Sequence, residues 1–310
     1  MLTVFSTPKP FRGHIGIIQR NALQSWKRLH PRVEVILFGD EEGAAEACAE
    51  LGLRHVPHVE RNEHGTKYLR SIFDAAQNAS EHKLVCYVNC DIILTPSFME
   101  ALTLAAHTLP NFLMVGRRWD TEIRESLDFE DPDWAKRVEH LARLQNRQQG
   151  PQWIDYFAFP RGLYTDIPPL VIGRVTWDNW LIWRARASSV PVVDASPVVT
   201  AIHQNHDYAY HPEGTAGVWG DEQARRNWEL AGGFRHLYTM EDATHRLIAG
   251  GIVPNPAHRY TPWKRELQML RQNLLSLVLR GTRPIRHALG LRKENLSRLR
   301  ARIRGIRASS

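Results

Sequence analysis

The 310-residue chain is poor in cysteine and contains no long hydrophobic run. Its three cysteines, Cys48, Cys86 and Cys90, show no repeated spacing that would indicate a disulfide framework or a zinc site, so we expect free thiols in a reducing compartment. The longest apolar stretches, such as Leu274–Leu279, fall far short of the ~20 residues that cross a bilayer. Met1–Pro10 leads into a strand-like segment without a charged and then apolar leader. These absences predict a cytoplasmic protein.

Acidic residues are scarce in the last part of the chain. Residues 258–310 contain 14 Lys/Arg and two Asp/Glu, whereas residues 1–257 contain 26 Lys/Arg and 31 Asp/Glu. The whole chain has a net charge of +7. A mildly acidic body followed by a strongly basic extension indicates two parts. We therefore expect one domain over residues 1–257 and a basic helical tail over residues 258–310.

The first half of the chain alternates apolar strand-like segments with amphipathic helical segments. The expected strands are Leu2–Phe5, Val33–Phe38, Arg54–Val56, Leu84–Val88 and Phe112–Val115, and the expected helices are His14–Leu29, Glu41–Leu51, Tyr68–Asn78 and a helix that begins at Pro96. This alternation predicts an α/β fold with a mostly parallel, Rossmann-like sheet flanked by helices. Ligands of such sheets bind beyond the carboxyl ends of the strands.

The second half of the chain is less regular. Two segments have helical character, Asp131–Gln148 and Trp177–Ala187, and two read as strands, Val190–Asp194 and Val198–His203. The aromatic segment Gln152–Tyr164 is expected to be a loop.

Polar side chains follow the expected strands of the first half where these strands end. They are Thr7, Lys9, Asp40, Asn89 and Asp91. Asp91 directly follows a buried strand, which places its carboxylate at the rim of the sheet. A divalent cation that bridges two phosphates needs one or two carboxylate oxygens, so Asp91 is a candidate metal ligand. The alternative is that Asp91 is only a turn residue or caps the helix that begins at Pro96.

The segment Asn89-Cys90-Asp91 resembles the Asp-x-Asp motif of glycosyltransferases with the GT-A fold, of the family-2 type, in an Asn-x-Asp variant. The resemblance covers residues 1–214. It implies a nucleotide-sugar-binding half over residues 1–116 and an acceptor-binding half over residues 117–257. It also implies that Asp91 binds Mn²⁺ or Mg²⁺, that Asn89 contacts the ribose or the metal, and that Asp40 contacts the nucleotide of a UDP-sugar or, less favoured, a GDP-sugar.

Asp178 lies just inside the expected start of a helix, after a loop that contains Gly173. This segment, with Trp177, is similar to the acceptor-binding loop of the same fold, in which an acidic residue is the catalytic base of inverting enzymes. Such a base removes a proton from the acceptor hydroxyl as the oxygen attacks the anomeric carbon. The alternative is that Asp178 only stabilises the helix N-terminus.

Two histidines, His203 and His206, end another expected strand. Many metal-dependent members of the fold supply a further ligand from a histidine in this part of the chain, and the resemblance implies that role for His206 or His203. Neutral imidazole is an acceptable ligand for Mn²⁺. The alternative is a solvated polar loop.

Further residues are candidates for binding donor or acceptor. Four basic residues are candidates to offset the negative charge of the diphosphate: Lys67, Arg70, Arg117 and Arg118. Trp153, Asp155 and Tyr156 are candidates for an acceptor platform, because sugars stack their apolar faces on aromatic rings. Surface exposure of the cations and core packing of the aromatics are the alternatives.

The basic tail carries two apolar stripes at helical spacing. The first comprises Trp263, Leu267, Leu270, Leu274 and Leu277, and the second comprises Leu289, Leu296, Leu299, Ile303 and Ile306 among arginines. A basic amphipathic helix favours an anionic membrane surface, so we expect peripheral attachment to the cytoplasmic face of a membrane. A solvated helix, RNA binding and oligomer contacts are alternatives.

Three functions are compatible with these patterns. The favoured one is a glycosyltransferase that moves a sugar from a nucleotide-sugar to a saccharide or lipid-linked acceptor, as in polysaccharide biosynthesis. A sugar-nucleotide nucleotidyltransferase is less favoured, because Ser6–Phe11 lacks the glycine-rich phosphate loop of that class. A nucleic-acid-binding protein that uses the tail is also less favoured, because the acidic body would repel phosphate backbones.

Overall fold

The computed structural model describes residues 1–206, 219–260, 263–267, 270–271 and 274. The chain divides into two units, Met1–Arg259 and Tyr260–Ser310. The second apolar stripe expected in the tail lies outside the described residues. Over the part of the chain that is described, no helix has both the length and the hydrophobicity needed to span a membrane.

A nine-stranded sheet forms the centre of the first unit, in the order β12-β11-β9-β6-β8-β4-β1-β2-β3. Its strands are β1 (Leu2–Ser6), β2 (Glu34–Phe38), β3 (Arg54–Val56), β4 (Leu84–Val88), β6 (Leu113–Val115), β8 (Tyr156–Pro160), β9 (Val192–Asp194), β11 (His245–Ile248) and β12 (Gly251–Pro254). Parallel pairing joins β3, β2, β1 and β4, and likewise β6, β9 and β11. The mostly parallel α/β fold is therefore confirmed.

Strand β8 is the main departure from the expected topology. It runs antiparallel between β4 and β6, in the middle of the sheet. The prediction of a loop over Gln152–Tyr164 was wrong for this stretch. The residues Tyr156 to Phe159 are all fully buried, because both faces of the sheet are covered. Such a strand lacks the alternation of apolar and polar residues that marks a half-exposed one.

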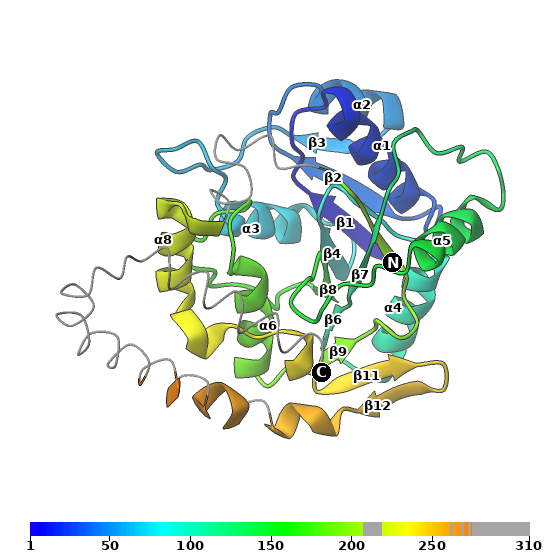
Figure 1. Cartoon of the computed structure of the whole chain (residues 1–310). Helices are drawn as coiled ribbons and strands as arrows, with labels where there is room; N and C mark the ends of the chain where they lie inside the picture. The colour runs from blue at the N-terminus through cyan, green and yellow to red at the C-terminus, as the bar shows by residue number, and fades with distance from the viewer. Residues whose placement is uncertain (207–218, 261–262, 268–269, 272–273, 275–310) are drawn as a thin grey trace, which may run out of the picture. The chain divides into compact units, whose positions relative to one another are not determined.

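Helices cover both faces of the sheet (Figure 1). On one face, α1 (Gly13–Lys27), α2 (Ala44–Leu51) and α4 (Pro96–Thr108) contribute to a core that includes β1, β2 and β4. On the other face, α3 (Leu69–Ala79) and α6 (Trp177–Ala187) build a second core rich in aromatic rings. The expected helices of the first half are present, with ends shifted by a few residues.

The aromatic core fixes the start of α6. Phe5, Phe73 and Tyr87 pack ring against ring with centroid distances of 5.1 to 5.6 Å. Trp177 packs edge-on against Tyr87 at 5.4 Å. Burying rings of this size makes a large contribution to stability. The first turn of α6, which carries Asp178, is therefore anchored on the end of β4.

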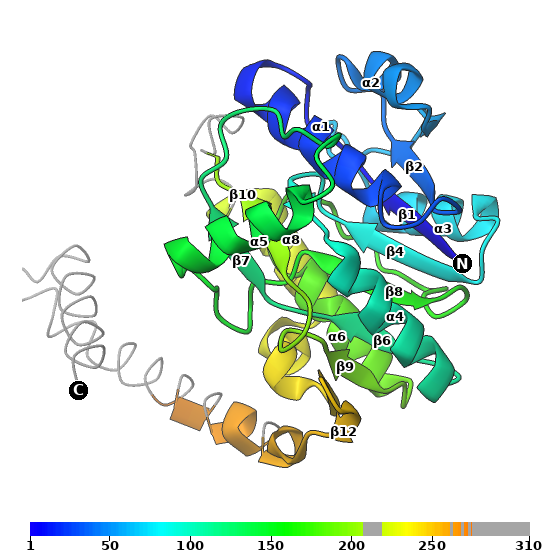
Figure 2. The ribbon, with the colours of Figure 1, turned by 90° about the vertical axis from the view of Figure 1, so that its right-hand side faces the viewer.

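A second, three-stranded sheet brings together segments that are far apart in the chain. It consists of β5 (Ile92–Ile93), β10 (Ala201–Gln204) and β7 (Arg118–Thr121), in that order. Strand β10 pairs antiparallel with β5 and parallel with β7. Helix α5 (Trp134–Gln145) covers this sheet through a small apolar core (Figure 2).

Shorter elements complete the first unit. They are α8 (Glu222–Ala231) and the 3₁₀ helices η1 (Gly233–His236), η2 (Met240–Asp242) and η3 (Pro256–Tyr260). Helix α8 lies beside α6 and carries an N-terminal cap, in which Asp221 accepts a hydrogen bond from the amide of Ala224 at 2.7 Å.

Candidate functional site

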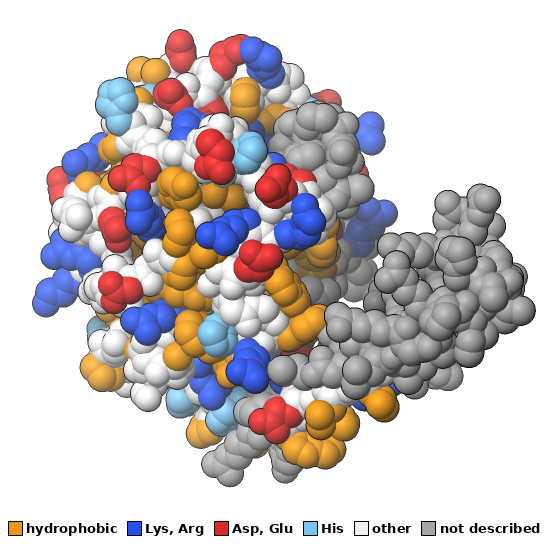
Figure 3. All heavy atoms as spheres, turned by 90° about the vertical axis from the view of Figure 1, so that its left-hand side faces the viewer, with side chains coloured by type: hydrophobic (Ala, Val, Ile, Leu, Met, Phe, Trp, Pro, Cys, Tyr) orange, Lys and Arg blue, Asp and Glu red, His pale blue; other side chains and the backbone are white. Residues whose placement is uncertain are grey.

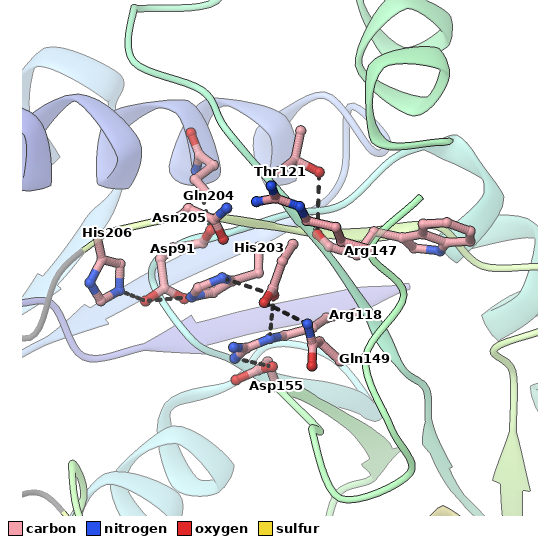
Figure 4. Close-up of polar contacts among 12 residues, drawn as sticks. Asp91, Arg118, Thr121, Arg147, Gln149, Asp155, His203, Gln204, Asn205 and His206 are labelled. Carbon is pink, nitrogen blue, oxygen red and sulfur yellow. Dashed lines mark hydrogen bonds and ion pairs between the residues drawn. The ribbon is translucent and has the colours of Figure 1, made fainter. Parts of the chain in front are cut away.

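Asp91, His203 and His206 converge beyond the carboxyl end of β4 (Figure 4). Oδ2 of Asp91 lies 3.1 Å from Nε2 of His206 and 4.0 Å from Nε2 of His203. One ligand atom from each residue lies within 4.8 Å of the other two. A carboxylate and two imidazoles form a donor set that suits Mn²⁺. The structure thus brings together the three residues that the sequence indicated as metal ligands.

The small sheet explains why these residues meet. In its register, His203 on β10 lies opposite Asp120 on β7 and opposite Ile92 on β5. Ile92 is the residue that directly follows Asp91. The amide of Gln204 donates to the carbonyl of Asp91 at 3.1 Å, which fixes the turn. Three short strands therefore hold the cluster in place.

The surroundings of Asp91 are prepared for a cation. Its Oδ1 is buried and, among the described residues, has no hydrogen-bond partner. Leaving a buried charged oxygen unpaired costs free energy, and a bound ion would remove that cost. Burial would raise the pKa of Asp91, but the hydrogen bond with His206 and the charges of Lys9 and His203 outweigh burial and lower the pKa far below its ordinary value. The residues present fit Mn²⁺ or Mg²⁺.

Lys9 lies at the same cluster. Its Nζ is 3.6 Å from Oδ2 of Asp91 and 3.1 Å from Nε2 of His206. The amide of Lys9 donates to the side chain of Gln19 in α1, so the loop after β1 is held against the first helix. A cation at this position can also face a phosphate, which suits Lys9 to the donor-binding crevice that the sequence indicated.

A polar network orients His203 from behind. Nδ1 of His203 lies 3.2 Å from Oδ1 of Asp120. Asp120 in turn accepts hydrogen bonds from Nε of Arg118 at 2.9 Å and from the amide group of Gln149 at 2.8 Å. Carboxylates that contact the far nitrogen of a ligating histidine fix its ring and raise its basicity. Sequence reasoning missed Asp120 and Gln149, because only the strand register places Asp120 beside His203 and Gln149 contacts Asp120 and not His203.

Arg118 connects this network to Asn89. Its Nη1 donates to Oδ2 of Asp155 at 3.0 Å, and Nδ2 of Asn89 donates to Oδ1 at 2.6 Å. The second contact continues the antiparallel pairing of β4 with β8, since Asn89 follows β4, Asp155 precedes β8, and the amide of Asn89 donates to the carbonyl of Asp155 at 2.9 Å. Asp155 is buried with both oxygens engaged, so it anchors the network and does not offer a free surface to an acceptor. The guanidinium of Arg118 also stacks over Trp153 at 4.6 Å.

Asp178 lies in the first turn of α6, as the sequence indicated, and is half-buried. Burial raises its pKa to about 7, and the nearby charge of Asp155 adds to the shift. A carboxyl with such a pKa is suited to general base catalysis near neutral pH. Thr176, at the N-cap, has a φ of 84° and a buried hydroxyl without a hydrogen-bond partner in the described structure. Backbone strain of this kind often accompanies functional sites.

The predicted nucleotide side is arranged differently from expectation. Lys67 is buried between the ends of β1 and β2, where its ammonium contacts Glu41 and the hydroxyl of Thr7. Burial lowers the pKa of Lys67, although Glu41 opposes the shift. Lys67 therefore joins two loops and does not extend toward an open phosphate site. Asp40 is exposed and pairs with Arg61.

Three further candidates lie outside the cluster. Arg70 is on the exposed face of α3 and donates to Glu60 at 3.1 Å, so the structure does not bring it to Asp91. Tyr156 is fully buried and packs edge-on against Phe98 at 5.5 Å. β8 points this ring into the core and not to the surface on which an acceptor platform was predicted. Trp177 is likewise buried in the second core.

Two candidates on the acceptor-binding side lie at or near the surface. Gly173 is exposed, in the loop before α6. Trp153 is half-buried and contacts both Arg118 and the exposed ring of Trp219.

No protein-family profile matches the chain, and no curated protein matches it. Among solved structures, it is similar to glucosyl-3-phosphoglycerate synthase from Mycobacterium tuberculosis in complex with Mg²⁺ and UDP, at 15% identity, covering 75% of this chain and 80% of that chain with a TM-score of 0.45. It is also similar to the mannosyltransferase PcManGT from Pyrobaculum calidifontis in complex with GDP-Man and Mn²⁺, at 12% identity. That similarity covers 65% of this chain and 56% of that chain, with a TM-score of 0.42. A third similar structure is S. aureus TarS 1–349 in complex with UDP-GlcNAc, at 13% identity. That similarity covers 41% of this chain and 37% of that chain, with a TM-score of 0.31. Similarities at this level carry no weight for the activity of this chain.

Proposed function

We propose that the protein is a metal-dependent glycosyltransferase that moves a sugar from a nucleotide-sugar donor to an acceptor hydroxyl. The observation that carries this proposal is the cluster of Asp91, His203 and His206 beyond the end of β4, with a buried carboxylate oxygen that has no hydrogen-bond partner in the described part of the chain. In parallel α/β sheets this position is where ligands bind. A second carboxyl, Asp178, has a pKa of about 7 and is suited to accept a proton.

The residues divide the chemistry between them. Asp91, His203 and His206 would hold Mn²⁺ or Mg²⁺, which when bound neutralises charge on the diphosphate leaving group. Lys9 adds a positive charge at the same place. Asp178 takes the proton of the acceptor hydroxyl while the hydroxyl oxygen attacks the anomeric carbon and the bond to the diphosphate breaks. Direct displacement of this kind inverts the configuration at that carbon.

The donor in this proposal is a UDP-sugar, with a GDP-sugar as the alternative, and the acceptor is a saccharide or a lipid-linked molecule of polysaccharide biosynthesis. Peripheral attachment to the cytoplasmic face of a membrane is part of the proposal. It is supported by the described part of the tail, where Trp263, Leu267, Leu270 and Leu274 are exposed. Basic residues accompany this stripe, and 14 Lys/Arg lie in residues 258–310.

A thermal-shift screen against UDP, GDP, CMP and dTDP, with and without Mn²⁺, tests the proposal. A ligand that binds only the folded state at about 100 times its Kd adds ~2.7 kcal/mol to the stability. We expect one nucleotide to raise the Tm only when Mn²⁺ is present, and the Asp91→Ala variant to lose this shift. Glu100→Ala, which removes an exposed carboxylate on α4, is the matched control and should keep the shift. No shift with any nucleotide would contradict the proposal.

A further inference from the structure

An exposed tryptophan adjoins the polar network of the site. Trp219 is 49% exposed, and its ring lies edge-on to Trp153 with a centroid distance of 5.7 Å and an interplanar angle of 60°. Exposing an indole ring to water forgoes a large hydrophobic contribution, although single exposed apolar residues are common. Trp219 differs from such residues because its ring contacts Trp153, which is itself held by Arg118.

A chain of contacts leads from Trp219 to His203, one of the candidate metal ligands. Trp153 is stacked beneath the guanidinium of Arg118 at 4.6 Å, and Arg118 is buried and held by the carboxylates of Asp120 and Asp155. Oδ1 of Asp120 in turn lies 3.2 Å from Nδ1 of His203. Side-chain contacts therefore connect the two indole rings to the candidate metal site.

The polar groups near Trp219 fit a hydroxyl-rich ligand better than an acyl chain. Asp221, the N-cap residue of α8, follows Trp219 by two residues in the chain and accepts a hydrogen bond from Nε of Arg174 at 2.7 Å. Gln223, in the first turn of α8, accepts a hydrogen bond from Asn62 at 2.8 Å. On the face that carries α3 and α8, acidic and basic side chains surround the apolar ones (Figure 3). Sites that bind small polar molecules combine an aromatic surface with a few convergent polar groups.

We propose that Trp219, supported by Trp153, is the surface on which a sugar ring of the acceptor stacks. The inference rests on the proposed function and narrows its acceptor: the group that receives the sugar belongs to a saccharide ring, not to a lipid alcohol or phosphate. The C–H face of a pyranose would cover the exposed indole ring, and its hydroxyls would meet the charged and amide groups of α8. Arg118 would act as a positioning residue, since it fixes the plane of Trp153.

The test compares Trp219→Ala and Trp219→Phe with Phe234→Ala. Phe234 is a suitable control because it is also an exposed ring that packs edge-on against a tryptophan, Trp228, at 4.6 Å. For each protein we would measure hydrolysis of the donor by water, the Kd of the nucleotide with Mn²⁺, and the KM for methyl glycosides and disaccharides of glucose, galactose, mannose and N-acetylglucosamine. Quenching of tryptophan fluorescence by the same saccharides, without donor, gives a reading that does not depend on transfer.

We expect Trp219→Ala to raise the KM for the saccharide acceptor at least about tenfold while donor hydrolysis and nucleotide affinity change by less than about twofold. Trp219→Phe should recover most of the loss, because it restores an aromatic face. The Phe234→Ala protein should match the wild type.

Two results would overturn the inference while leaving the proposed function intact: an unchanged KM in Trp219→Ala, or transfer by the wild type to a polyprenyl phosphate and to no saccharide. A wild-type protein that binds no nucleotide, but whose tryptophan fluorescence responds to saccharides and loses this response in Trp219→Ala, would contradict the transferase and support the sugar surface. No transfer to any saccharide and no fluorescence response would sink the stacking surface itself.

Discussion

At the scale of single residues, the site contains two carboxyls whose surroundings shift their pKa values in opposite directions. Asp91 is surrounded by Lys9, His203 and His206, so its pKa is lowered and it is ionised at neutral pH. Asp178 is desolvated at the start of α6, so its pKa is raised to about 7. Pairs of this kind commonly divide charge binding and proton transfer between them. The pKa of Asp178 leads to two predictions, one for rate and one for stability.

We predict that the transfer rate falls as the pH decreases through about 7, because a protonated Asp178 cannot accept the proton of the acceptor hydroxyl. The measurement is kcat/KM between about pH 5.5 and 8.5 at saturating Mn²⁺. In the Asp178→Asn variant the rate should be lower by roughly 10²–10⁴-fold, and the remaining activity should lose this pH dependence. A flat profile in the wild type would argue against Asp178 as the base.

The same pKa predicts that Asp178→Asn stabilises the protein at alkaline pH. The pKa of the carboxyl rises from 3.8 in the unfolded chain to about 7 in the fold. Its contribution to the free energy of unfolding is therefore fully present below about pH 4 and is lost as the pH rises through 7. A neutral amide does not suffer this loss. Urea unfolding at pH 8 should show the variant to be more stable, with an upper bound of about 4 kcal/mol. The gain should vanish near pH 4, and an equal gain at both pH values would refute this explanation.

At the scale of elements, the small sheet determines the geometry of the metal cluster. His203 faces Asp120 only because β10 and β7 pair in parallel register. We predict that Asp120→Asn, which removes no direct ligand, raises the Mn²⁺ concentration needed for nucleotide binding by about 10–100-fold. Titrating Mn²⁺ into the protein with the nucleotide present measures this, with Glu100→Gln as the control. A titration curve identical to wild type would show that Asp120 does not support His203.

The turn after β2 provides a further prediction. Gly39 has a φ of 116°, and a Cβ there would approach Nζ of Lys67 to 2.7 Å. Gly39→Ala should therefore destabilise the protein by about 1–3 kcal/mol, because it combines an unfavourable backbone conformation with crowding of a buried cation. Thermal unfolding measures the loss. At Gly220 an added Cβ would meet no atom within 4 Å, so Gly220→Ala should leave the Tm unchanged or slightly raised.

Local sequence patterns were sufficient for much of the fold, because β1, α1, β2 and β4 carry clear periodicity and turn residues. The grouping of Asp91 with His203 or His206 was implied by the family resemblance, because strand ends alone do not say which side chains meet. The position of β8 could not be predicted, because an antiparallel strand buried on both faces resembles any apolar segment. The contacts of Asp120 could not be predicted either, because they depend on strand register. The contacts of Lys67 could not be predicted because lysine is usually exposed and here is buried.

At the scale of the whole molecule, the two units differ in charge. Basic residues are concentrated after residue 257, and the described part of the tail exposes an apolar stripe beside Lys264 and Arg265. We predict that the protein sediments with vesicles that contain anionic lipid and not with neutral ones, and that added salt releases it. Leu267→Ser with Leu270→Ser should weaken this binding severalfold without changing transfer to a soluble acceptor. Equal binding to neutral vesicles would contradict the electrostatic part.

The small sheet also has a consequence for how the chain would acquire the proposed metal. Its strands come from positions 92–93, 118–121 and 201–204, so the cluster exists only after distant segments have paired. Contacts of such high sequence separation are made slowly, because the loops between them must first be closed. During synthesis, a nascent chain that has not yet passed residue 206 lacks the full set of ligands. Capture of Mn²⁺ would therefore mark the completion of folding, and in a refolding experiment the metal should stabilise the product without accelerating the early steps.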